Sequence, residues 1–138
     1  MRKSLIFLSL LLTACVPPEG GLTEDDVAGE WTLVDASLRG QEITIGNNPL
    51  TLRLDPDGDL GGTAACNDYA GTYDVVASIF DLGAEMMMTT ADCEEAAMRL
   101  EEEYFQAIRL VDSVAITEEG ELHLVGEEAD LLFEPANG

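Results

Sequence analysis

The chain has 138 residues, a length that suits one domain with a single hydrophobic core. It carries 28 acidic residues against six lysines and arginines, so its formal net charge is −22. Such a surface repels nucleic acid and anionic lipid head groups, which excludes a nucleic-acid-binding role. Hydrophobic residues make up 46% of the chain, and this content indicates a folded core rather than a disordered acidic chain.

The first residues have the pattern of an export signal. Arg2 and Lys3 precede an apolar run over residues 5–12, and small residues then lead to Cys15. The run is far shorter than the roughly 20 residues that span a bilayer, so residues 1–14 are expected to be a cleaved signal peptide. Leu12-Thr13-Ala14-Cys15 resembles the lipobox of bacterial lipoproteins, which implies lipidation of Cys15 and a membrane anchor. An ordinary secreted protein with a chance cysteine at the cleavage site is the alternative.

The mature chain would begin with a linker. Residues 15–26 contain two prolines, two glycines and several acids, and we expect a lipidated flexible tether there, followed by the domain over residues 27–138. Four arginines and no lysine then face 28 acids, for a charge of −24 over 124 residues. Two explanations of this acidity stay open: adaptation to a salty habitat, or a surface that binds a basic protein partner.

Alternating apolar residues predict short strands along the first two thirds of the domain. A proline- and glycine-containing turn is expected at residues 55–59, and a second turn at residues 67–71. The expected strands cover residues 30–37, 41–45, 50–54, 60–66, 72–77, 79–82 and 85–90.

The apolar period then changes to that of a helix. Apolar or small residues recur in steps of three and four over residues 92–111, which predicts one amphipathic helix. Asp92 is the expected N-cap with Glu95 as its capping-box partner, and Glu101 is expected to face solvent with most of its acidic neighbours. Strands over residues 114–117, 121–125 and 129–133 complete the chain. The sum predicts a mainly β fold with one helix (α+β), a small antiparallel β-barrel or curled sheet covered by that helix.

Two cysteines remain once Cys15 carries lipid. Cys66 and Cys93 would lie in an oxidising compartment, where a disulfide is the default expectation. Closing a loop of this length contributes about 3–3.5 kcal/mol in the chain-entropy estimate. A metal pair or a reactive thiol are the alternatives.

Three other features are candidate sites. Asp55, Asp57 and Asp59 have the spacing that opens an EF-hand loop, but Cys66 stands where the bidentate glutamate should be, which favours a solvated turn. His123 alternates with two leucines and should point to water. Met86–Met88 are expected to fill core space, with one residue under the helix; an apolar binding patch is the alternative.

A polar cluster follows Cys66. Asn67, Asp68, Tyr69 and Tyr73 gather at the expected second turn, with Gly71 between the two tyrosines. Asn and Gly supply the backbone angles of a turn, so a structural role is favoured, and a recognition loop is the functional alternative.

In order along the chain, these segments resemble the META (HslJ-like) domain family. The matching residues are Gly29–Val34, Asp57-Gly58, Gly61–Tyr73, Met86–Thr90, Cys93, Met98, Glu101–Phe105 and Leu122–Leu124. Ala65 departs from the pattern, because glycine is expected before Cys66. The resemblance implies a small barrel-like β fold with a helix, in secreted or surface proteins, and it implies no established reaction. Members of the family are linked to stress tolerance, motility and virulence.

The sequence therefore predicts a non-enzymatic lipoprotein of the bacterial cell envelope that supports stress resistance or envelope integrity. No nucleophile stands beside His123 in the sequence, and no cofactor or metal is expected. Val16 follows Cys15, at the position where an aspartate often signals inner-membrane retention; resemblance to lipoprotein sorting therefore implies outer-membrane placement in an organism that has an outer membrane. The alternative is a monomeric periplasmic binding or inhibitor module that captures a basic partner through its acidic surface.

Overall fold

A computed structural model of the chain describes residues 20–136. The predicted signal peptide and Cys15 lie outside these residues. Within the described part, segments with one buried and one exposed face form nine antiparallel strands and two helices. The strands are β1 (Gly29–Leu38), β2 (Gln41–Glu42), β3 (Thr51–Leu54), β4 (Asp59–Ala64), β5 (Asn67–Val76), β6 (Ile79–Met88), β7 (Ser113–Ile116), β8 (Leu122–Val125) and β9 (Ala129–Pro135).

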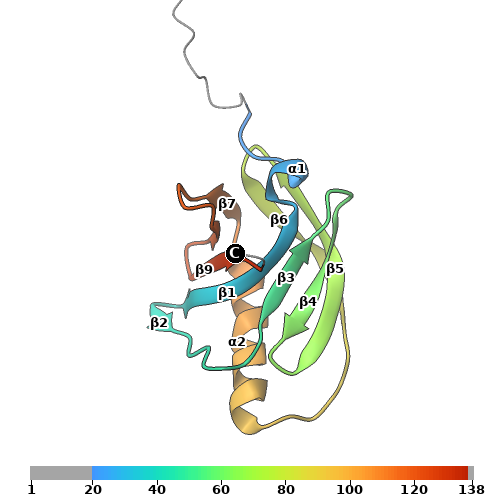
Figure 1. Ribbon diagram of the computed structural model, residues 1–138, viewed down its shortest axis with the longest axis vertical. Coiled ribbons are helices and arrows are strands. Elements are labelled where there is room, and N and C mark those ends of the chain that lie inside the picture. The colour runs from blue at the N-terminus through green and yellow to red at the C-terminus, as the bar shows by residue number, and fades with distance from the viewer. Residues whose placement is uncertain (1–19, 137–138) are drawn as a thin grey trace, which may run out of the picture.

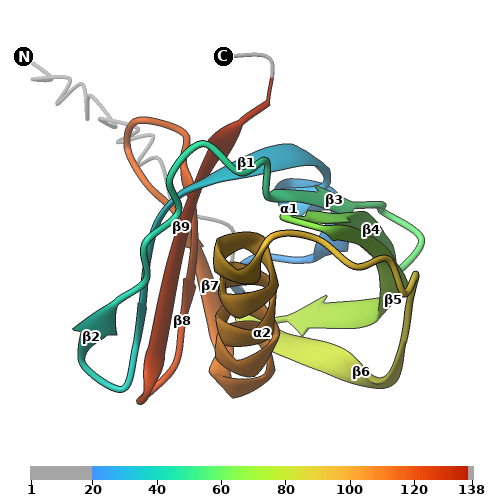
Figure 2. The ribbon, with the colours of Figure 1, turned by 90° about the horizontal axis from the view of Figure 1, so that it is seen from below.

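The strands form one curled sheet that closes into a ring. Neighbours along the sheet follow the order β2-β1-β3-β4-β5-β6-β7-β8-β9, and β1 also pairs with β9. This closing register runs from Trp31 opposite Pro135 to Leu38 opposite Ala129. The pairing is thinnest between β6 and β7, where Ile79 opposite Ser113 is the one Cα register pair. Figure 2 shows α2 (Glu95–Leu110) lying between β6 and the strands β7 to β9. The predicted curled sheet covered by a helix is confirmed.

The helix α2 closes the core. Leu100, Tyr104 and Ala107 lie on its inward face and Val111 is its C-cap, and all four side chains are buried, as the periodicity predicts. Burial of this apolar face, rather than capping, holds the helix in place. The expected start at Asp92 is wrong: the helix begins at Glu95, with Glu94 as the N-cap and no side-chain hydrogen bond to cap it.

Inward side chains of the strands alternate with exposed ones and complete a single core. Leu52 and Leu54 of β3 point inward while Arg53 between them is exposed, as strand geometry requires. The largest fully buried side chains are Tyr73, Tyr104, Phe80, Phe133, Leu50, Leu52, Leu54, Leu60, Leu100, Ile108, Leu122 and Leu124.

The chain joins the domain earlier than its composition suggests. Residues 24–27 form a helical turn, α1 (Glu24–Val27), in which Thr23 and Asp26 make a capping box. Val27 is fully buried, and Glu24 accepts a hydrogen bond from the backbone N–H of Val75 (3.1 Å). Figure 1 shows this helical turn beside the end of the molecule where the chain enters. The part of the expected tether from Leu22 onward is thus folded against the sheet.

Three strand assignments change. The expected turn at residues 67–71 is the start of β5, and the turn lies at Ala65 and Cys66 instead. The two short strands expected over residues 79–90 are one strand, β6, with an irregular register opposite Gly71 and Tyr73. The strand expected over residues 41–45 extends only through Glu42. Within the described residues, neither helix has the length and apolar character required to cross a membrane.

Candidate functional site

The polar cluster after Cys66 lies where β5, the loop before α2 and α2 itself meet. A disulfide joins Cys66 and Cys93, with 5.9 Å between their Cα atoms, as the cysteine count predicts. Ala65 precedes it with φ of 61°, a left-handed conformation that favours glycine. This backbone angle gives a physical reason for the expectation of glycine before Cys66, where this chain has alanine.

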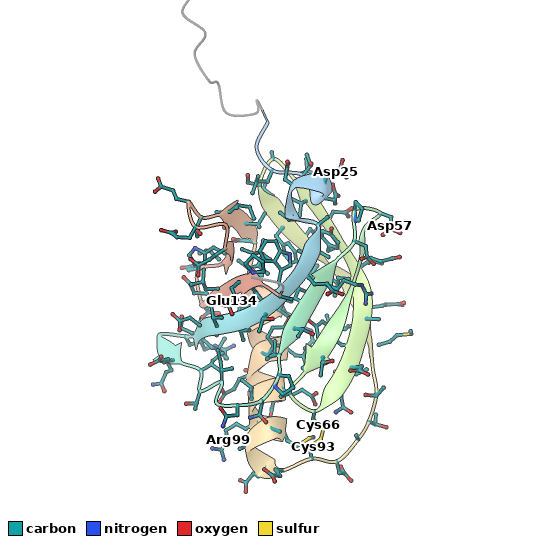
Figure 3. The ribbon with its side chains drawn as sticks, in the orientation of Figure 1. Asp25, Asp57, Cys66, Cys93, Arg99 and Glu134 are labelled. Carbon is teal, nitrogen blue, oxygen red and sulfur yellow. A yellow bond between two sulfur atoms is a disulfide. The ribbon has the colours of Figure 1, made fainter. Side chains whose placement is uncertain are left out.

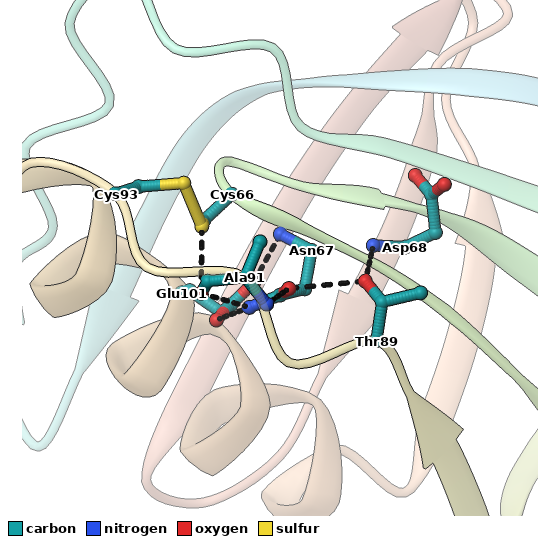
Figure 4. The surroundings of a disulfide bond; sticks show 7 residues. All are labelled: Cys66, Asn67, Asp68, Thr89, Ala91, Cys93 and Glu101. Carbon is teal, nitrogen blue, oxygen red and sulfur yellow. Dashed lines mark hydrogen bonds between the residues drawn. A yellow bond between two sulfur atoms is a disulfide. The ribbon is translucent and has the colours of Figure 1, made fainter.

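Asn67 binds the segments together through every polar atom of its side chain. Its Oδ1 accepts hydrogen bonds from the Ala91 backbone N–H (2.6 Å) and the Thr89 hydroxyl (3.0 Å). Its Nδ2 donates to Oε2 of Glu101 (2.9 Å), and its backbone N–H donates to Oε1 of the same carboxylate (2.7 Å). Figure 4 shows this arrangement beside the disulfide.

Glu101 is the residue of this cluster that sequence reasoning placed wrongly. It is 7% exposed instead of facing solvent, and Asn67 is 4% exposed. The two are the buried polar or charged residues of the described core. A buried carboxylate is tolerated when charge-assisted hydrogen bonds replace its water, and Asn67 supplies two of them. We call Cys66, Asn67, Thr89, Cys93 and Glu101 the disulfide node.

The tyrosines predicted in the recognition loop point into the core. The Tyr69 hydroxyl lies 2.7 Å from that of Tyr104 and donates to the Thr51 carbonyl oxygen (2.6 Å). Burial raises the pKa of Tyr69, and that of Tyr104, well above the ordinary value. Asp68, by contrast, is exposed and accepts a hydrogen bond from the Thr63 hydroxyl (2.9 Å). The predicted recognition residues therefore do not form one exposed surface.

Tyr73 lies at the other end of β5 under a group of carboxylates. Its hydroxyl donates to the Asp55 carbonyl oxygen (2.6 Å). Burial, and then the negative charges of Glu24, Asp55 and Asp57, raise its pKa to about 12. Figure 3 places Asp57 and Asp25 at this end of the molecule.

The three aspartates with EF-hand-like spacing serve a turn. Carboxylate oxygens of Asp55, Asp57 and Asp59 lie within 4.8 Å of one another. The Asp57 carboxylate accepts the Asp59 backbone N–H (3.1 Å), and Arg53 pairs with Asp55 (3.3 Å). These contacts give two of the three carboxylates a role in the β3–β4 hairpin, as the sequence favours.

His123 and the methionine run occupy the surface. The His123 ring is half-buried, with Nε2 2.6 Å from an Asp130 carboxylate oxygen on the paired strand. Met86 packs partly against the core, but Met87 and Met88 are 74% and 44% exposed. The expectation that the run fills core space therefore holds for Met86 alone. Met88 lines a surface hollow of about 640 Å³ against α2, together with Met98 and Phe105.

The comparisons with known proteins agree on the fold. An NMR structure of a protein from Burkholderia xenovorans is similar with a TM-score of 0.68 and 19% identity, over 91% of this chain and 96% of that one. A second NMR structure has a TM-score of 0.62 and 18% identity, over 83% of this chain and 96% of the other. A crystal structure of a DUF4847 family protein from Bacteroides vulgatus has a TM-score of 0.55 and 12% identity, over 77% of this chain and 91% of the other.

These likenesses, all below 25% identity, establish the fold alone. No curated protein matches the chain. The family model of the META domain matches residues 24–137, which spans the folded part from α1 to beyond β9. The chain therefore belongs to the META domain family.

Proposed function

We propose that this protein is a non-enzymatic lipoprotein of the bacterial cell envelope, whose META domain supports envelope integrity under stress. The order of segments carries the proposal. An apolar run of signal-peptide length over residues 5–12 leads through Thr13 and Ala14 to Cys15, and the family domain begins at residue 24, nine residues later. A folded acidic domain attached so close to an acylated cysteine would stay in water at the surface of a membrane. Val16, the residue after Cys15, favours the outer membrane as that membrane.

The chemistry of the disulfide node supports a non-enzymatic role. Its polar atoms are engaged with one another: Glu101 with Asn67, and Asn67 with Thr89 and the backbone of Ala91. The nearby tyrosines have a pKa raised by burial, so they stay protonated at neutral pH and do not serve as bases there. Such groups stabilise a fold rather than turn over a substrate.

The anchor is tested by substitution of the acceptor cysteine. Cys15→Ser should abolish labelling by radioactive palmitate and release the protein from the membrane fraction, or trap its precursor. A strain lacking the protein should survive envelope stress poorly and recover with the wild-type chain but not with Cys15→Ser. Unchanged acyl labelling in the variant would sink the lipoprotein proposal, and normal survival of the deletion strain would sink the envelope role.

A second candidate is capture of a basic protein partner. The observation that favours it is the group of carboxylates around Tyr73, from Glu24 and Asp25 of α1 and Asp55 and Asp57 of the β3–β4 turn. Against it, exposed or half-buried acids occur on six of the nine strands (all but β3, β7 and β8) and on both helices. That spread favours habitat adaptation over a single binding groove.

The two candidates differ in their response to salt. A captured partner should be recovered from envelope extract at low salt, lost at high salt, and lost when Glu24 and Asp57 are both replaced by their amides. Replacement of Glu118 and Glu119, on the β7–β8 turn, is the matched control. Equal recovery with both double variants would exclude a specific acidic site.

A further inference from the structure

The tip of the β5–β6 hairpin exposes an aliphatic pair. Val76 and Ile79 lie opposite each other at the end of the hairpin and are 67% and 61% exposed. The turn between them consists of Ala77 and Ser78, both with positive φ (52° and 64°). Hairpin twist favours such a turn, in which Val76 and Ile79 project from the same outward face. With Met87, they are the most exposed large hydrophobic side chains of the described residues.

This tip is fixed to the point where the N-terminal segment enters the domain. The Leu22 backbone N–H donates to Oγ of Ser78 (2.9 Å), and the Ser78 N–H donates to the Leu22 carbonyl (3.1 Å). Gly21 approaches so closely that a Cβ there would lie 2.8 Å from the Ala77 carbonyl carbon. The entry point and the hairpin tip therefore form one unit, and Figure 1 shows both at the same end of the molecule.

We propose that Val76 and Ile79 form a second contact with the membrane, resting in the interfacial region of a zwitterionic phospholipid surface. The proposal rests on lipidation of Cys15, as in the proposed function. Gly21 is six positions after Cys15, and a chain of that length reaches at most about 20 Å. The anchor thus holds the tip close to the lipid, and a weak apolar contact suffices because binding of the tip becomes intramolecular.

Charge sets the depth and the kind of lipid. Asp74 and Asp81 pair with each other two residues behind Val76 and Ile79, on the same outward face, and both are exposed. At about 3.3 Å per residue, the apolar end is only about 7 Å deep, which matches an interfacial contact and not insertion. These carboxylates, with Asp25 and Asp26 of α1, repel anionic head groups, so the contact favours zwitterionic lipid.

The contact is tested with tryptophan placed on the tip of the lipidated protein. Val76→Trp is reconstituted in phosphatidylcholine vesicles with brominated acyl chains, which quench nearby indole fluorescence. The matched control is Met87→Trp, because Met87 is 74% exposed at the far end of β6, the partner strand in the same hairpin. Trp31, the single native tryptophan, is buried and gives the same background in both.

Emission of Val76→Trp should fall at least twofold in brominated vesicles, while that of Met87→Trp stays unchanged. Adding Ile79→Asp, or half phosphatidylglycerol in the vesicles, should remove most of the quenching. Equal quenching at both positions, or none while the protein floats with the vesicles, would overturn the hairpin contact and leave the anchor intact. If the wild-type protein does not float with vesicles at all, the anchor itself fails, and the contact fails with it.

Discussion

Glu101 lies within α2, and both of its carboxylate oxygens accept hydrogen bonds from Asn67. In Glu101→Gln the side-chain amide would present N–H groups to one of these donors. We expect a loss of about 1–3 kcal/mol in the free energy of unfolding, because a buried donor is left without its acceptor. Urea unfolding of residues 16–138 measures it. The exposed neighbour is the control: Glu102→Gln should change stability by less than about 0.5 kcal/mol, and equal losses would contradict the account.

The position of Glu101 shows what helical periodicity can and cannot predict. The spacing of apolar residues correctly places Leu100 and Tyr104 in the core. It says nothing of a carboxylate whose partner is Asn67, 34 residues away in the sequence. A buried polar pair is specified by two distant residues together, so neither position reveals it alone.

The three tyrosines couple stability to alkaline pH. All have a folded-state pKa above the ordinary value of 10.0, mainly because burial disfavours the tyrosinate. Their stabilisation is fully present below pH 10 and is lost as pH rises through the folded values, near 12 for Tyr73. We expect the free energy of unfolding to fall above pH 10, and tyrosinate absorbance to appear together with loss of structure. Substantial tyrosinate absorbance at about pH 10 in a protein with unchanged circular dichroism would contradict this.

At the scale of the elements, α2 depends on its buried face. Leu100 is 2% exposed and packs in the main core cluster. Truncation of a buried leucine typically costs about 2–5 kcal/mol, so Leu100→Ala should lower the melting temperature sharply. Met98→Ala, on the exposed face of the same helix, is the matched control and should have little effect. If the two variants melt together, α2 is not docked on the sheet.

The elements that were predicted wrongly fail for local reasons. Asn, Asp and Gly after Cys66 are typical of a turn, but hydrogen bonds to Glu101 and Thr89 hold Asn67 in the first position of β5. The irregular register in the β5–β6 pairing leaves residues 83–85 opposite Thr72. In the sequence, these extra residues interrupt the alternation and therefore resemble a gap between two strands. Alternation correctly gives the remaining strands, because each has one face on the core.

For the whole molecule, the dominant electrostatic feature is repulsion among carboxylates. Of the acids that the structure describes, Glu101 is the one that is buried, so the rest interact through solvent. The Debye length falls from about 10 Å at 0.1 M salt to about 3 Å at 1 M. Sodium chloride should therefore raise the melting temperature of residues 16–138 at pH 8, most steeply at low concentration.

The same repulsion weakens when carboxylates are protonated, so the salt effect should shrink between about pH 4 and 5. Stabilisation by excluded anions such as sulfate would persist at every pH and is distinguished in this way. A melting temperature at pH 8 that does not change between low salt and 1 M sodium chloride would show that bound cations or local contacts already compensate the charge.

The sequence predicts a curled sheet with a covering helix, but it does not predict which strands pair to close the sheet. The register of β1 against β9 joins residues near the two ends of the domain, and alternation in either strand is the same whatever its neighbour. The placement of α2 beside the thin β6–β7 pairing is likewise set by packing across the whole ring, so local pattern does not contain it.

That ring closure has a consequence for the timing of folding. Trp31 of β1 pairs with Pro135 of β9, so β1 can complete its pairing only when almost the entire chain has been synthesised. Pairing between strands so far apart in the sequence is slow, and a nascent chain that lacks β9 cannot close the sheet into a ring. In the proposed function the protein is exported, and this delay would then be useful, since a translocation channel passes only unfolded chains. Under the proposed export, the order of synthesis would help to keep the chain unfolded until its last strand has been made.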